Sequence, residues 1–180
     1  YMPEKLDSAK NFANKLWNAS KFVLMNLEDY KEKKFDAKEL SNEDKWIISK
    51  LNKLIKEVTV NFENYDLGVA AAKIYDFIWN EFCDWYIEIV KTRLYDKENS
   101  TRTMAQYTLN KVLGEVLKLL HPIMPFITDE IYTKLYNNDE SIMISAWPTP
   151  CKEYEFEKEE YHLEEIKKII IQIRNTRTNM

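Results

Sequence analysis

The chain has 180 residues, a net charge of −4, two cysteines and only two glycines. This length suits one domain with a sizeable core, and two cysteines do not form a disulfide framework, so we expect a reducing, intracellular setting. Two glycines cannot supply a Gly-rich phosphate loop, no apolar run reaches the roughly 20 residues of a membrane helix, and an acidic chain can bind nucleic acid only through a local patch.

Helical periodicity dominates the first half of the chain. Residues 8–27 place their apolar side chains on one side of a helix. Ser41, followed by Asp44 three residues later, forms an acidic variant of a capping box and starts a second helix. A third helix is predicted from Asp66 to about Tyr95. Its predicted inward stripe is Ala71, Ile74, Ile78, Phe82, Trp85 and Ile89.

The second half also reads as helical, with a sharp break. A fourth helix is predicted from about Ser100 to Leu120, where the prolines of "HPIMP" end it. A short helix follows, from Pro125 to Tyr136. The run 137–150 is irregular and compatible with a brief strand.

The last part of the chain differs in composition. Residues 153–165 are acidic, and isoleucines at helical spacing from Ile166 onward predict one more amphipathic helix. The predicted fold is therefore an all-α helical bundle over residues 1–152, with a distinct segment over 153–180.

The stretch "WNEFCDWY", residues 79–86, could be an active site or the buried face of a helix. A nucleophilic cysteine needs a base, and the two histidines of the chain, His121 and His162, are distant in sequence from Cys83. Free cysteine packs like a small hydrophobic residue. We therefore interpret the stretch as core, and we find no catalytic constellation and no metal-ligand spacing in the sequence.

The first helix has a second face that does not fit a core. About 120° of its surface carries amides, lysines, one aromatic ring and a methionine. These residues are Asn11, Asn14, Lys15, Asn18, Lys21, Phe22 and Met25. Residues 8–27 contain three lysines and no acid. Amides suit base edges, lysines neutralise phosphates and an aromatic ring stacks on a base, so the pattern favours RNA. The alternative is a solvated face, with Phe22 packed under the 29–40 connector.

Several segments resemble valyl-tRNA synthetases, in the same order along the chain. They are "NFANKLWNASKFVLMN", "IYDFIWNEFCDWYIEIVK", "LLHPIMPFITDEIY", "SIMISAWP" and "IRNTRTNM". The resemblance implies the α-helical anticodon-binding domain of a class I synthetase, whose first helix faces the anticodon loop. By motif, Lys15, Lys21 and Phe22 fall at the family's anticodon contacts, and helix geometry adds Asn11, Asn14 and Asn18. Lys21 keeps the charge of an arginine at that position but loses its stacking plane.

The resemblance also implies partners. The parent enzyme would join valine to its tRNA in the cytoplasm, using ATP and magnesium, whereas this piece lacks the HIGH and KMSKS motifs and is expected to be non-catalytic and without a cofactor. Its expected partners are the tRNA(Val) anticodon stem-loop and the catalytic domain of the same chain, with no membrane and no DNA. Residues 153–180 would begin the linker toward a C-terminal coiled-coil arm. The alternatives are the same domain of an isoleucyl-type synthetase, or a helical protein-interaction module that binds no RNA.

Overall fold

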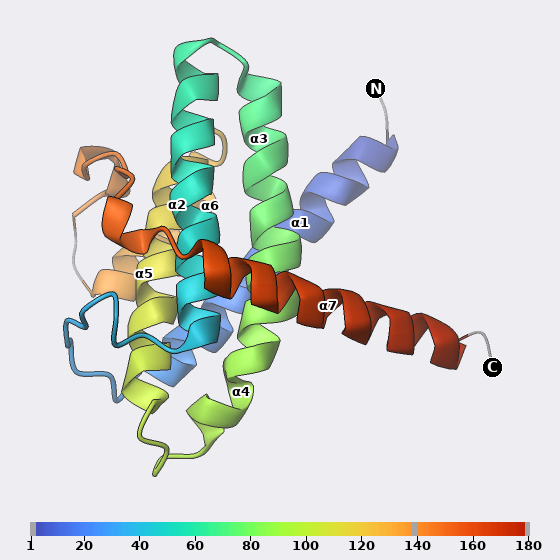
Figure 1. The fold of residues 1–180 in the computed structure, drawn as a ribbon. Helices are drawn as coiled ribbons and strands as arrows, with labels where there is room; N and C mark the ends of the chain where they lie inside the picture. Colours follow the sequence, from blue (N-terminus) through green and yellow to red (C-terminus); the bar gives the residue numbers. More distant parts are fainter. Residues whose placement is uncertain (1–2, 138–139, 179–180) are drawn as a thin grey trace.

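The computed structural model describes residues 3–137 and 140–178, and within these ranges every regular element is helical (Figure 1). The predicted all-α class is therefore confirmed. In chain order the elements are α1 (Pro3–Leu27), α2 (Asn42–Glu63), α3 (Leu67–Asp76), the π-helix η1 (Phe77–Tyr86), α4 (Ile87–Tyr95), α5 (Arg102–Leu120), α6 (Pro125–Tyr136), the short 3₁₀ turns η2 (Ile142–Ile144) and η3 (Lys152–Tyr154), and α7 (Glu157–Thr178).

The core lies between α1, α2, α5 and the continuous run formed by α3, η1 and α4. In Figure 1, α2 and α3 form a hairpin, α5 lies beside α2, and α1 crosses behind the hairpin. The largest fully buried side chains include Trp46, Phe82 and Tyr86. The helix break at "HPIMP" is where the sequence predicts it, because α5 ends at Leu120 and α6 begins at Pro125.

The third helix runs without interruption but changes its geometry at η1. Buried residues recur along it at every fourth position: Ile74, Ile78, Phe82, Tyr86, Val90 and Leu94. Four residues overshoot an α-helical turn by about 40°, so such a stripe would wind off the core face of a plain α-helix. A π-helical turn takes about one residue more, and ten residues of η1 therefore bring the stripe back onto the core.

The predicted inward stripe of this helix is right at Ile74, Ile78 and Phe82, but Ala71, Trp85 and Ile89 are only partly buried. It placed Trp85 and Ile89 in the core because it assumed about 100° per residue throughout. Both residues are only partly buried, and Tyr86 is fully buried instead. Trp85 lies under α7, with the Arg174 guanidinium 5.3 Å from its ring.

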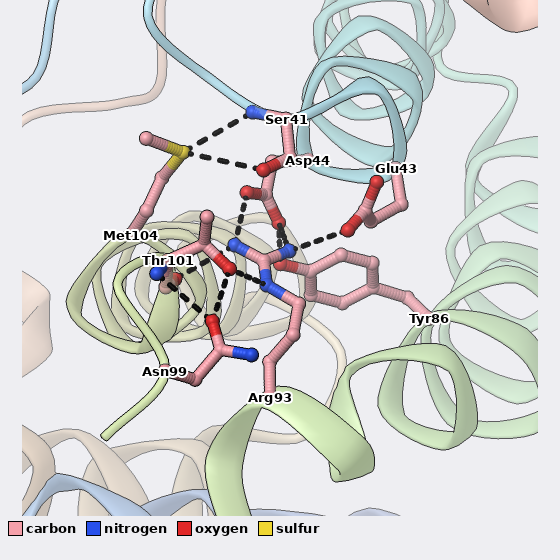
Figure 2. A network of polar contacts seen from close by, with 8 residues as sticks. All are labelled: Ser41, Glu43, Asp44, Tyr86, Arg93, Asn99, Thr101 and Met104. Carbon is pink, nitrogen blue, oxygen red and sulfur yellow. Dashed lines mark hydrogen bonds and ion pairs between the residues drawn. The ribbon is translucent and has the colours of Figure 1, made fainter. Parts of the chain in front are cut away.

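A buried ion pair joins α2 to α4 (Figure 2). Asp44 is completely buried, and Arg93 donates from Nη1 and Nη2 to its two carboxylate oxygens at 3.0 and 2.9 Å. The Tyr86 hydroxyl donates to the same carboxylate at 2.6 Å. The guanidinium also donates to Glu43 and to Thr101. Burial raises the pKa of the Asp44 carboxyl, and Arg93 and Tyr86 offset only part of this effect.

The predicted capping box is therefore wrong, although Ser41 does occupy the N-cap position of α2. Its side chain makes no capping hydrogen bond. Its backbone N–H and hydroxyl face the Met104 sulfur instead, at 3.1 and 3.5 Å. Asp44 is not free to act as the reciprocal partner because its carboxylate is bonded to Arg93.

The C-terminal part also departs from the prediction in two places. In residues 140–150 the structure has the 3₁₀ turn η2 and no strand, and α7 begins at Glu157 rather than at Ile166. The acidic residues from Glu157 to Glu165 are thus part of α7, and Glu160 accepts hydrogen bonds from Ser49 and Lys53 of α2. Figure 1 shows α7 crossing α2 and extending away from the bundle. The division of the chain at residue 152 remains a prediction.

Candidate nucleic-acid interface

The outer face of α1 is a solvated surface of amides and lysines. Four of the predicted site residues, Asn11, Asn14, Asn18 and Lys21, are exposed there. Lys10 and Met25 lie on the same face, and Met25 is 71% exposed. At the helical repeat, these six residues occupy an arc of about 100°. The predicted exposure is therefore confirmed for Asn11, Asn14, Asn18, Lys21 and Met25. The face has no acid within residues 8–27, and exposed Asp7 lies on it one turn before Asn11.

The sequence predicts that Phe22 projects away from the core, and this prediction is wrong. Its ring is partly buried and packs against the core cluster. The Lys91 ammonium of α4 is 5.8 Å from the ring centroid. The physical reason is that α1 contacts η1 as well as α5 and α6, so more of its circumference is covered than a single apolar stripe indicates. The ring thus lies at the edge of the solvated face, on its η1–α4 side.

Lys15 lies on the same side and is already engaged. Its ammonium is 2.6 Å from Asp84 Oδ1 and 3.8 Å from the centroid of the Trp79 ring, both on η1. Trp79 stacks in turn on Tyr75 at 5.5 Å, with an interplanar angle of 13°. Lys15 is therefore a partly buried cation held between a carboxylate and an aromatic face, and not a free lysine on the outer face.

On the opposite side of the α1 face, a groove of about 610 Å³ runs between α1 and α6. Lys21 and Lys134 both line it, and their ammonium groups are 5.7 and 5.0 Å from the ring of Trp17. Sequence reasoning missed Trp17 and Lys134. Trp17 has no distinguishing local signal, and Lys134 joins the α1 face only through the packing of α6.

The predicted packing role of "WNEFCDWY" is confirmed by the position of Cys83. The side chain is 9% exposed, and burial raises the pKa of its thiol to about 12. In the part of the chain that the structure describes, no cluster of three or more His, Cys, Asp or Glu residues could hold a metal ion. Over the same residues, no helix is long and apolar enough to cross a membrane.

The chain belongs to the family described as the anticodon-binding domain of tRNA ligase, which matches residues 44–180. The match begins in α2, so α1 lies outside it.

Comparison with curated proteins extends the similarity to the whole chain. Valine--tRNA ligase of Clostridium acetobutylicum is 49% identical over 100% of this chain. The corresponding enzyme of Thermotoga maritima is 47% identical over 99% of it. The chain spans only about 20% of the length of these relatives, and it corresponds to their anticodon-binding region.

Proposed function

We propose that this chain binds the anticodon stem-loop of tRNA(Val) through α1, as the recognition part of a valine--tRNA ligase. The observation that carries the proposal is the outer face of α1, which combines exposed Asn14, Asn18 and Lys21 with no acid over residues 8–27 of an acidic chain. Single-stranded RNA loops are read by hydrogen bonds to base edges and by stacking on aromatic rings. Family membership and the identity to valine--tRNA ligases support the same assignment.

The six residues proposed for the contact divide into two sets. Asn11, Asn14, Asn18 and Lys21 are exposed and need no rearrangement to meet RNA. Lys15 and Phe22 lie at the junction with η1 and α4, where a base that stacks on Phe22 would also meet Lys91. A ring that is already half packed is more rigid than a free one, which lowers the entropy lost when a base stacks on it.

In the parent enzyme, this part would grip the anticodon so that the acceptor end of the tRNA reaches a distant active site in the cytoplasmic ligase. The catalytic domain of the same chain would supply the ATP and magnesium chemistry. Two glycines provide no phosphate cradle here, so the residues present do not fit ATP. Residues 153–180 would lead toward a further helical arm.

A gel-shift titration tests the proposal. The tRNA(Val) anticodon stem-loop should bind more tightly than the same stem with a scrambled loop or with the isoleucine anticodon. Preference for the isoleucine loop would transfer the assignment to an isoleucyl-type domain, and equal binding of all three would remove the recognition function.

Variants of the outer face locate the contact. Asn18→Ala and Lys21→Ala should each weaken binding without changing the melting temperature, because both side chains are exposed. Lys158→Ala on α7 is a matched control, since it removes an exposed lysine from a different helix. An equal loss from Lys158→Ala would mean that α1 is not the specific contact.

A further inference from the structure

The Lys15–Asp84 pair stands between α1 and η1, at the edge of the proposed RNA-binding face. The side chains are 23% and 50% exposed, and their charged atoms are 2.6 Å apart. The Lys15 ammonium also lies 3.8 Å from the Trp79 ring centroid. Trp79 stacks on Tyr75, and Tyr75 packs on Phe12 with ring centroids 4.8 Å apart, so the aromatic side of the site is anchored to the buried Phe12 side chain of α1.

The Lys15–Asp84 ion pair is weak enough for another anion to replace Asp84 as the partner of Lys15. Ion pairs with partly exposed members contribute little to stability, because water and salt screen them. The Trp79 ring can keep the ammonium in place when the carboxylate is displaced, since a cation–π contact does not require a counterion. A phosphate oxygen of bound RNA could then take the position that Asp84 Oδ1 occupies in the free protein.

We propose that Asp84 is a selectivity residue of this site: it neutralises Lys15 in the free protein and opposes any RNA phosphate that replaces it. The inference rests on the proposed function. The displaced carboxylate remains beside the incoming phosphate, and two like charges repel. Only an RNA whose base contacts on α1 offset this repulsion binds well, so the Lys15–Asp84 latch suppresses indiscriminate binding of polyanions.

Asp84→Asn tests the latch. It removes the repulsion while leaving an amide of the same shape, so affinity for the tRNA(Val) stem-loop at low salt should rise about fivefold, as one unit-charge repulsion at roughly 4 Å in water predicts. Affinity for the scrambled loop should rise by a larger factor, because a selectivity residue must change the ratio between the two affinities, and an equal rise for both loops would overturn the proposal. The salt dependence should steepen by about 0.7, because Lys15 no longer has a built-in counterion. The melting temperature should change by less than about 2 °C.

Two further variants isolate the cause. Asp76→Asn removes the same charge about two turns earlier on the same helical run. The Asp76 carboxylate accepts a hydrogen bond from Asn80 rather than from a residue of α1. It should leave affinity and salt dependence unchanged. In a Lys15→Ala background, Asp84→Asn should lose the change in salt dependence, since the cation that it liberates is gone.

The outcomes separate the two proposals. If the unmodified chain shows no preference for the tRNA(Val) loop, the proposed function is wrong, and the role proposed for Asp84 is wrong with it. If the chain binds selectively and Asp84→Asn weakens binding or leaves it unchanged, Asp84 either contacts RNA directly or only supports packing, and the latch is wrong. An equal gain from Asp76→Asn would reduce the effect to net charge and would also overturn it.

Discussion

Replacing Arg93 by methionine should strongly lower the free energy of unfolding of this domain, and the size of this decrease should depend on pH. Arg93→Met retains much of the apolar stem but removes every donor that faces the fully buried Asp44 carboxylate from α4. Leaving one member of a buried ion pair without its partner costs about 3 to 5 kcal/mol. For a chain of this length the melting temperature should fall by about 6 to 20 °C at pH 8.

The pH dependence follows from the pKa of Asp44, which burial already raises above its ordinary value of 3.8. Removing Arg93 removes the strongest opposing influence, so the pKa in the variant rises further. An acid with a raised pKa binds more protons in the native state, and stability therefore falls as pH rises from the unfolded to the folded pKa. The deficit of Arg93→Met relative to the unmodified chain should thus be smaller at pH 4.5 than at pH 8.

Urea unfolding followed by circular dichroism at both pH values measures this deficit. Asp44→Asn added to Arg93→Met should restore part of the stability at pH 8 and abolish the difference between the two pH values, because no buried charge remains. Lys73→Met is the control: both members of the Lys73–Glu57 pair are partly exposed, at 37% and 53%, so loss of that pair should cost less than about 1 kcal/mol. A pH-independent deficit, or one no larger than that of the control, would show that Asp44 does not carry a buried charge.

Three other variants and probes extend these expectations. Phe22→Ala should weaken stem-loop binding by roughly five- to 150-fold, which corresponds to about 1 to 3 kcal/mol for a lost base stack. It should also lower the melting temperature, because the ring packs against the core. A lower melting temperature with unchanged affinity would mean that Phe22 only packs. A thiol reagent at pH 8 should modify Cys151 faster than Cys83, whose pKa is about 12, and rapid labelling of both would contradict the buried position of Cys83. Gly114→Ala should destabilise the α5–α6 packing by about 1 to 3 kcal/mol in a urea titration, because the added Cβ would overlap the Tyr136 hydroxyl, and an unchanged midpoint would mean that this ring moves aside freely.

The sequence was sufficient for the order of the main helices and for the solvated part of the α1 face, but not for the π-helix η1 or for the start of α7 at Glu157. Apolar periodicity and two prolines are local signals, and they located the helices and the break after Leu120. The exposure of Asn14, Asn18 and Lys21 also follows from their angle on one helix. These features depend on neighbouring residues in the chain, which is why they could be predicted without knowledge of the packing.

The rest depends on contacts between distant residues. Asp44 and Arg93 are 49 positions apart, and nothing near Asp44 distinguishes a buried ion-pair member from a capping residue. Phe22 was misplaced because a helical wheel assumes one core direction, whereas α1 contacts α5, α6 and η1. Lys15 was correctly singled out, but its engagement by Asp84 and Trp79 could not be foreseen from either segment alone. Whether these residues bind RNA remains a prediction.

The π-helical η1 determines how this domain tolerates a change in the number of residues between two contacts. Within η1, Trp79 and Asp84 face α1, and downstream Arg93 faces α2. A π turn holds about one residue more than an α turn, so loss of an exposed residue such as Asn80 is absorbed when a π turn becomes an α turn, and Arg93 keeps its direction toward Asp44. A one-codon deletion from a run that is already α-helical has no such extra residue to remove, and it would rotate everything after it by about 100°.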